Sequence, residues 1–554
     1  MTPLGYAWQR TAPHWKLWTG GAILRTVFRL LPLQVPIVAG WMINRLGQSP
    51  AAADASLAAQ INQYGFALAG LAALTGFSAY GSVRLRKQLE NQLDGALQQQ
   101  VWKGWQSAAP SFRASFGLDR FTTQTLPYCS AAGDLAGECA MEGLAAAARM
   151  AYPILMLLLI DPWLALLPLG LLPLQAMLSH LATNHGQRHA ASEREARRKA
   201  KKLMAHSLAG ADTIQTLSAQ TRLATWIEEA QQRFEGAKEA KRKYERVLSS
   251  AVWGIAALAL ALSWWVGAHR VASGALSLGQ LVTFAGFVGF LALPLRSFSR
   301  IFRKFRNALD RLGQVREFLL AADRAAVSKR HFSSLPEGVV LQMKNVSCEA
   351  FGSPILAKVS AVFPEGEFIW VRGRSGCGKT TFLQLLAGLE TPAQGSVVAS
   401  AGPIALVQQH SEIFPTSLRA NLLLAQPKAS DTEIFGVLEG VGLLSLVENQ
   451  KQGLAAVVGE DLRLNAGERQ RLALARALLR KPRVLLLDES LSALDEEAEL
   501  QILNFLAKQK PHVTIILVAH QVRSLSAIDR VMELRDGQLH EWATQYKQLS
   551  DERE

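Results

Sequence analysis

Six long apolar stretches in the first 300 residues restrict the fold of this chain more than any other feature. A helix that crosses a bilayer needs roughly 20 mostly apolar residues, although one stretch alone also suits a buried core helix. Six in series favour transmembrane helices, and we predict a membrane domain over residues 19–300. The stretches cover approximately residues 19–45, 62–83, 143–160, 162–182, 249–268 and 278–296.

Basic residues lie between these stretches. The long connecting segments 84–142 and 183–248 are rich in Lys and Arg, whereas the other three connections have almost none. Because basic loops stay in the cytoplasm, we predict that both segments and both chain ends are cytoplasmic. Topology thus explains much of the net charge of +14. The lipid bilayer is an expected partner, and nucleic acid is not.

The first 18 residues differ from the apolar stretches that follow. They mix three tryptophans with basic Arg10 and Lys16. Such a mixture is typical of a short helix that lies in the membrane interface. We therefore predict an interfacial helix over residues 1–18.

A phosphate-binding loop lies in the second half of the chain. Residues 336–554 have the composition of a soluble α/β domain, and we predict that residues 301–335 link it to the membrane domain. Glycines let backbone N–H groups turn toward an anion, and the following helix adds its partial positive charge. Lys379 is expected to reach the β- and γ-phosphates, and the Thr380 hydroxyl to bind Mg²⁺. The motif reads Gly373-Arg374-Ser375-Gly376-Cys377-Gly378-Lys379-Thr380 and fits G-x-x-x-x-G-K-[ST].

Two further apolar runs end in polar residues suited to nucleotide chemistry. Val484–Asp488 is typical of a buried parallel strand, and Asp488 at its end can hold Mg²⁺. Glu489 can orient and deprotonate the attacking water. His520 follows the apolar run 514–518 and is well placed to contact a γ-phosphate.

In this order the motifs resemble the ATP-binding domain of ABC transporters over about residues 335–545. The resemblance implies ATP and Mg²⁺ as cofactors, with the metal held by Thr380, Gln409 and Asp488. It also implies that Glu489, His520 and Lys379 are catalytic. The matching motifs are Walker A (Gly373–Thr381), the Q-loop (Gln409), the signature (Leu464-Asn465-Ala466-Gly467-Glu468), Walker B (Val484–Glu489), the D-loop (Ser492-Ala493-Leu494-Asp495) and the switch histidine (His520).

Six spans before one such domain resemble the exporter-type (type IV) half-transporter. This implies an integral protein of the bacterial inner membrane that couples ATP hydrolysis to alternating-access transport, with export favoured. In that family, short helices near 116–125 and 211–218 would dock on the ATP-binding domains. The alternatives are a siderophore transporter half that imports, a thiol- or haem-type exporter half, and a structural half whose ATPase is dispensable.

The signature departs from the usual Leu-Ser-Gly-Gly-Gln, because Asn465, Ala466 and Glu468 replace three of its residues. In the family this motif covers the γ-phosphate bound by the other subunit, and Glu468 would place a negative charge near it. One reading is tolerated variation. The other, which we favour, is a heterodimer with a second half-transporter in which one ATP site is degenerate; a homodimer stays an alternative.

In the family an aromatic residue stacks on adenine, and in this chain the nearest aromatic residue stands one position later. Ala350 stands at the expected position, and Phe351 follows it. A small shift of the loop would let Phe351 stack on the base. Phe351 is therefore our candidate for adenine contact.

Charges within the spans suggest a substrate cavity, because they are costly there and tend to be functional. Arg25 and Arg29 lie one turn apart in the first span, and Arg296 and Arg300 repeat that spacing after the last. They could attract a small or amphiphilic, anionic substrate. Alternatively, they snorkel to lipid headgroups or meet acidic groups of the ATP-binding domain.

Overall fold

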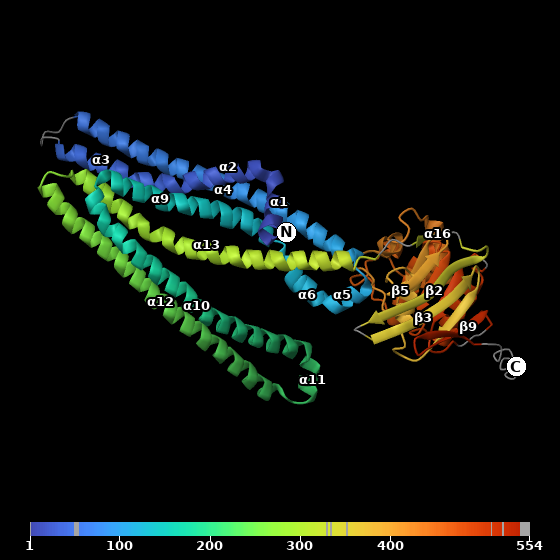
Figure 1. Ribbon diagram of the computed structural model, residues 1–554. Coiled ribbons are helices and arrows are strands. Elements are labelled where there is room, and N and C mark those ends of the chain that lie inside the picture. Colours follow the sequence, from blue (N-terminus) through green and yellow to red (C-terminus); the bar gives the residue numbers. More distant parts are fainter. Residues whose placement is uncertain are drawn as a thin grey trace. The chain divides into compact units, whose positions relative to one another are not determined.

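The computed structural model describes residues 2–48, 55–327, 331–332, 335–350, 353–510, 512–522 and 526–542. They form two compact units, which we treat separately. The helical unit comprises Met1–Trp102 and Asp119–Leu319, and the α/β unit comprises Lys103–Leu118 and Leu320–Glu554. A helical unit that precedes an α/β unit agrees with the predicted fold class (Figure 1).

Long helices make up the helical unit. Four described helices are long and apolar enough to cross a membrane, at Leu4–Gly47, Ile61–Ser107, Leu118–Ile160 and Ser250–Ala272. Shorter apolar helices at Pro162–Leu178 and Leu278–Leu291 coincide with the two remaining predicted spans. The count of six spans stays a prediction. The principal helices are α1 (Pro3–Thr11), α2 (Trp15–Leu30), α3 (Val35–Gln48), α4 (Ala55–Ser107), α9 (Glu142–Ile160), α10 (Pro162–Ala209), α11 (Ala211–Thr216), α12 (Gln220–Ala272) and α13 (Leu278–Arg324).

The cytoplasmic segments predicted as loops are largely helical. Segment 183–248 consists of the extended ends of α10 and α12, which run side by side, with the short helix α11 between them (Figure 1). Segment 84–142 contains the end of α4, then α5 (Pro110–Phe116), α6 (Leu118–Arg120), α7 (Leu126–Tyr128), α8 (Ala131–Gly133) and two π-helical turns, η3 (Phe121–Thr125) and η4 (Asp134–Met141). Most of the expected linker 301–335 is also helical, because α13 continues to Arg324.

The α/β unit contains two sheets. The larger has the order β10-β9-β4-β8-β7-β6, in which β9, β4, β8, β7 and β6 are parallel. The smaller has the order β1-β5-β2-β3. The strands are β1 (His331–Phe332), β2 (Val339–Ala350), β3 (Ser353–Pro364), β4 (Phe368–Arg372), β5 (Gln394–Ala399), β6 (Ile404–Val407), β7 (Val484–Asp488), β8 (Thr514–Val518), β9 (Arg530–Arg535) and β10 (Gln538–Glu541).

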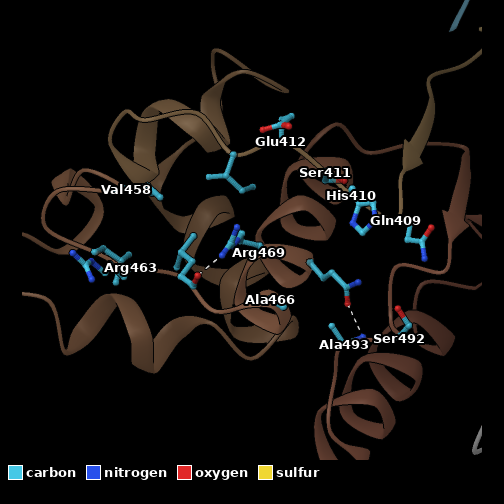
Figure 2. A pocket seen from close by; sticks show the side chains of 15 residues that line it. Gln409, His410, Ser411, Glu412, Val458, Arg463, Ala466, Arg469, Ser492 and Ala493 are labelled. Atoms are coloured by element: carbon cyan, nitrogen blue, oxygen red, sulfur yellow. Dashed lines mark hydrogen bonds between the residues drawn. The ribbon is translucent and has the colours of Figure 1, made fainter. Parts of the chain in front are cut away.

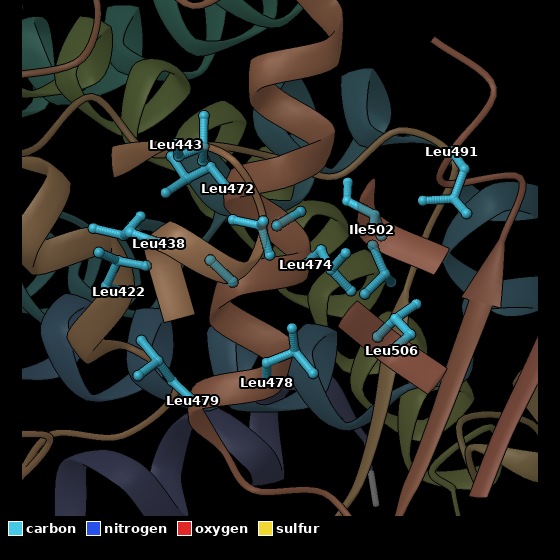
Figure 3. Packing of buried hydrophobic residues seen from close by; sticks show 14 of the residues in the cluster. Leu422, Leu438, Leu443, Leu472, Leu474, Leu478, Leu479, Leu491, Ile502 and Leu506 are labelled. Atoms are coloured by element: carbon cyan, nitrogen blue, oxygen red, sulfur yellow. The ribbon is translucent and has the colours of Figure 1, made fainter. Parts of the chain in front are cut away.

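Burial on both faces explains the apolar runs of the central strands. Every residue of β7 and β8 is buried, as expected for parallel strands covered on both sides. Beside the sheet, α18 (Ala466–Leu479) packs Leu472, Leu474 and Leu478 into an apolar cluster with α16 (Asp431–Gly440) and α19 (Glu496–Ala507) (Figure 3). This packing holds the carboxyl ends of the strands and the start of α18 in fixed positions.

Part of the first cytoplasmic segment belongs to the α/β unit. The Ser111 backbone N–H and hydroxyl group, at the start of α5, donate to the Glu390 carboxylate at 3.2 and 2.7 Å. Residues 119 onward cluster with the helical unit instead. This contact places α5, which lies largely before 116–125, against the α/β unit, and docking near 116–125 stays a prediction.

Candidate functional site

The phosphate-binding loop connects β4 to α14 (Lys379–Leu386), as the sequence predicts. Gly378 caps α14 with φ +101°, and a Cβ there would lie 2.4 Å from Ile355 Cγ2. Only glycine adopts this conformation at low cost and fits this space. The loop geometry therefore depends on the glycine of the motif.

Lys379 is held at the centre of the site. Its side chain is 5% exposed, and its ammonium donates to the Gly373 and Arg374 carbonyl oxygens at 2.9 and 3.1 Å. Nζ also lies 3.8 Å from a Glu489 carboxylate oxygen. The lysine can therefore exchange these contacts for phosphate oxygens without leaving the loop.

Asp488 and Thr380 form a pair suited to a divalent cation. Asp488 is 4% exposed, and burial raises the pKa of its carboxyl group, although a hydrogen bond from the Thr380 side chain opposes that rise. A desolvated carboxylate beside a hydroxyl group offers the oxygen ligands that Mg²⁺ prefers. The two residues fit a Mg²⁺ site, with the ion's charge offsetting the cost of burying the carboxylate.

Glu489 is the point where the other predicted side chains meet. Gln409 Nε2 donates to Glu489 Oε2 at 2.9 Å, and His520 Nε2 lies 3.2 Å from Oε1. Together with Lys379, these residues place three polar groups around one carboxylate. Gln409, predicted as a metal ligand, contacts this carboxylate through its amide.

The backbone at Glu489 is unusual. Its φ is +48°, in the left-handed region that costs a residue other than glycine about 1–2 kcal/mol. Its N–H donates to the Val518 carbonyl at 2.8 Å, and its carbonyl accepts the Ser492 hydroxyl at 2.8 Å. These bonds from β8 and the D-loop hold the strained residue with its carboxylate among the candidate catalytic groups.

The unusual signature residues form a capping box at the start of α18. Asn465 is the N-cap, and its side chain accepts the Glu468 N–H at 2.8 Å, while the Glu468 carboxylate accepts the Asn465 N–H at 2.8 Å. Such reciprocal bonds satisfy two N–H groups that a helix start leaves unpaired. Asn465 and Glu468 therefore have a structural reason to occur together.

The remaining signature residues differ in the space around them. Ala466 is exposed, so its methyl group meets no obstacle within this chain. Gly467 is buried, and a Cβ there would lie 3.1 Å from the Ala493 carbonyl oxygen of the D-loop. The glycine that the motif retains is thus the one that close packing requires.

The D-loop is attached to the signature helix. The Ala493 N–H donates to Gln470 Oε1 at 3.1 Å, and Asp495 caps α19 by accepting the Ala498 N–H. Leu494, between them, is buried. Sequence reasoning missed Gln470, although its place on the predicted signature helix was a usable signal.

A groove of about 770 Å³ lies between the Q-loop and the signature (Figure 2). The Q-loop contributes Gln409, His410 and Glu412, and α18 contributes Ala466 and Arg469. An Arg476 guanidinium N–H joins the two sides by donating to the Glu412 carbonyl at 2.6 Å. No pattern in the sequence indicated this groove directly.

Phe351, the candidate for adenine contact, lies outside the described residues. The side chain of Arg296 also lies outside them. Both assignments stay predictions.

Arg25 and Arg29, the other cavity candidates, share one acidic partner. Arg25 Nε lies 2.6 Å from a Glu142 carboxylate oxygen, and Arg29 pairs with the other oxygen. The Glu142 side chain is 14% exposed. Glu142 begins α9 of the helical unit, so both arginines meet an acidic group of that unit and not one of the ATP-binding domain, and sequence reasoning missed Glu142 as their partner.

Two family models match the chain. Residues 21–295 match the ABC transporter transmembrane region, and residues 356–492 match the model described as ABC transporter. Together they cover both units.

Individual relatives are similar over about half of the chain. An export ATP-binding/permease protein of Rickettsia typhi is 29% identical over 51% of this chain and 52% of its own length. The leukotoxin export ATP-binding protein LtxB of Aggregatibacter actinomycetemcomitans is 30% identical over 53% of this chain and 43% of its own length. The chain thus spans about half, or less, of these curated relatives.

Among solved structures, a bacterial Atm1-family ABC exporter with ATP bound has a similar fold. The TM-score is 0.79, with 19% identity over 97% of both chains. This likeness extends over the helical and the α/β unit alike.

Proposed function

This chain belongs to the ABC transporters, with the transmembrane region and the ATP-binding region fused, and we propose that it is an ATP-driven exporter subunit. It is an integral membrane protein whose ATP-binding domain is cytoplasmic. The observation that carries the proposal is the convergence of Lys379, Gln409 and His520 on Glu489.

The proposed chemistry is ATP hydrolysis. Backbone N–H groups of the phosphate loop and the Lys379 ammonium bind and orient the phosphates. Asp488 and Thr380 hold Mg²⁺, which would supply charge neutralisation at the β- and γ-phosphates. Glu489 accepts a proton from the attacking water, and His520 orients the carboxylate or the γ-phosphate.

An active ATPase is favoured over a purely structural half. Glu489 has a backbone conformation that costs free energy, and three polar side chains surround its carboxylate. Strain of this kind persists where the surrounding structure maintains it, and it concentrates at functional sites. A structural half would gain nothing from it.

Glu489→Gln tests the proposal in the purified native complex of the full-length protein. The change keeps the side-chain shape and one acceptor oxygen but removes the base, so ATP turnover should fall roughly 10²- to 10⁴-fold. The control is Glu439→Gln, an exposed glutamate of α16. Turnover that is equal in Glu489→Gln and wild type would contradict catalysis.

The partner we propose is a second half-transporter whose signature faces the phosphate loop of this chain. The Glu468 carboxylate at the start of α18 supports unequal sites, because it would weaken attraction of a second γ-phosphate. The resulting heterodimer would have one competent site, built on Lys379 and Glu489 of this chain. Stoichiometric trapping of nucleotide in the native complex tests this, since equal turnover at two sites of a homodimer would contradict it.

Coupling to transport is proposed to use the short helices of the cytoplasmic segments. The Ser111–Glu390 contact supports such a role for α5. For α11, we propose the groove between Q-loop and signature in the partner as the docking place. Exposed Leu217, which follows α11, offers an apolar contact. Cross-linking of cysteines placed at Thr213 and His410 across the dimer tests the pairing, which a lack of product would contradict.

A further inference from the structure

A basic groove of about 650 Å³ lies within the helical unit, between α10, α12 and α13. Sites for small ligands usually measure about 300–1,000 Å³, so the space suits a small molecule. Seven cationic and two acidic side chains line it, together with Phe302 and Asn307. The charged residues are Arg194, Arg197, Lys241, Arg300, Arg303, Lys304, Arg306, Glu193 and Asp310.

Internal ion pairs neutralise only part of this charge. Lys241 lies 2.8 Å from Glu193, and Lys304 pairs with Glu138. Within the described part of the chain, Arg300, Arg303 and Arg306 have no acidic partner. Their spacing of three residues places them along one side of α13. The groove therefore presents a row of guanidinium groups that a ligand can bind.

The groove lies beyond the apolar parts of its helices. Arg300 lies four residues after the predicted span 278–296, and Lys241 lies eight residues before the predicted span 249–268. At 1.5 Å per helical residue these separations are roughly 6 and 12 Å, and Arg306 lies roughly 15 Å beyond its span. Because the headgroup layer adds only about 5–8 Å on each side of the hydrocarbon core, most of the groove lies beyond it, which favours a ligand from the aqueous phase over a lipid headgroup.

We propose that this groove binds the transported substrate at the cytoplasmic entrance, and that the substrate is a small organic molecule with several anionic groups. Guanidinium groups bind carboxylates, sulfonates and phosphates through paired N–H donors. Phe302, 67% exposed at the groove, offers an apolar contact beside them. This inference rests on the proposed transport function and gives its substrate class.

The charge of the groove sets the expected affinity change. A cation about 5 Å from an anionic group in water contributes roughly a fourfold gain in affinity. If the contributions add, replacing three arginines weakens binding of a polyanion by about 60-fold at low salt, and salt reduces the difference.

Pyrene tetrasulfonate is a suitable probe. Its fluorescence anisotropy reports binding to the full-length protein in phosphatidylcholine nanodiscs. The test variant is Arg300→Gln/Arg303→Gln/Arg306→Gln, and the same three changes to Lys preserve the charge. A matched control removes three cations outside the groove lining, with Arg198→Gln/Arg242→Gln/Lys243→Gln. We expect the glutamine variant to bind the probe weakly, and the lysine variant and the control to bind it as wild type does.

Several outcomes would overturn the inference. Wild-type protein that does not bind the probe, or a glutamine variant that binds as tightly as the control, would exclude a polyanion site. Loss of binding in nanodiscs with phosphatidylglycerol would identify a lipid headgroup as the occupant instead.

Basal ATP turnover separates this inference from the proposed function. The glutamine variant should hydrolyse ATP as wild type does. If Glu489→Gln is inactive and wild type does not bind the probe, only the groove inference fails. If Glu489→Gln hydrolyses ATP as wild type does, the proposed function fails, whether or not the protein binds the probe.

Discussion

Glu468→Gln isolates the charge of the signature capping box from its hydrogen bonds. The Glu468 carboxylate accepts the Asn465 N–H at 2.8 Å, and a glutamine carbonyl can accept the same bond. The cap is therefore kept, while the favourable effect of an anion at a helix start, about 0.3–1 kcal/mol, is lost. We expect the Tm to fall by only a few degrees.

The same change should strengthen nucleotide binding at the site that this signature covers. For a phosphate roughly 7 Å from the carboxylate, the repulsion between unit charges is about 0.6 kcal/mol in water and about 2.4 kcal/mol at an effective dielectric constant of 20. Removing it should lower the Kd for ATP by about 3- to 50-fold.

The assay is equilibrium binding of a fluorescent ATP analogue to the purified complex, with thermal unfolding measured in parallel. Glu433→Gln is the matched control, because Glu433 occupies the same position in the capping box of α16 and is not in the signature. An unchanged Kd for Glu468→Gln with an intact Tm would refute the argument that this charge weakens the site. If Glu433→Gln lowered the Kd for ATP equally, the effect could not be assigned to the charge at the signature.

Three other predictions concern the loop, a buried acid and a shared ion pair. Gly378→Ala should abolish ATP binding, because its methyl group would meet Ile355 and φ is +101°; unchanged binding of labelled ATP would contradict this. Burial raises the pKa of Asp94 to about 6, so the folded state binds its proton more tightly than the unfolded state and stability falls as pH rises from about 4 to 6. Asp94→Asn should accordingly raise the Tm more at pH 8 than at pH 4, and an equal effect at both would refute it. Glu142→Gln should lower the Tm more than Arg25→Gln, because one carboxylate serves two guanidinium groups; the reverse order in scanning fluorimetry would argue against shared pairing.

Local patterns were sufficient to predict the strands and the helix that frame the candidate nucleotide site. A glycine-rich loop between an apolar strand and a helix has few alternative structures, and Asp488 followed directly from the end of its strand. The contact between Gln409 and Glu489 joins residues 80 positions apart, and only the resemblance to a family indicated that they belong to one site.

Other features were beyond the sequence for physical reasons. A polar cytoplasmic segment can form a loop or a helix. Segment 183–248 is helical because the ends of α10 and α12 pack against each other. The partner of Arg25 and Arg29 could not be found, because Glu142 is more than 100 residues away. The capping box at Asn465 could have been predicted, because Asn465 and Glu468 have the three-residue spacing of that motif. The family pattern suggested a phosphate contact for these residues instead.

The attachment of the D-loop gives the two ATP sites of the proposed dimer a means of mutual influence. Ser492 binds the backbone of Glu489, which acts at one site, and the next residue binds Gln470 on the helix that covers the other. Only a few covalent bonds separate these two contacts. A shift of α18 as it closes on nucleotide at the degenerate site would thus change the position of the base at the competent site, so that binding at the first would regulate hydrolysis at the second.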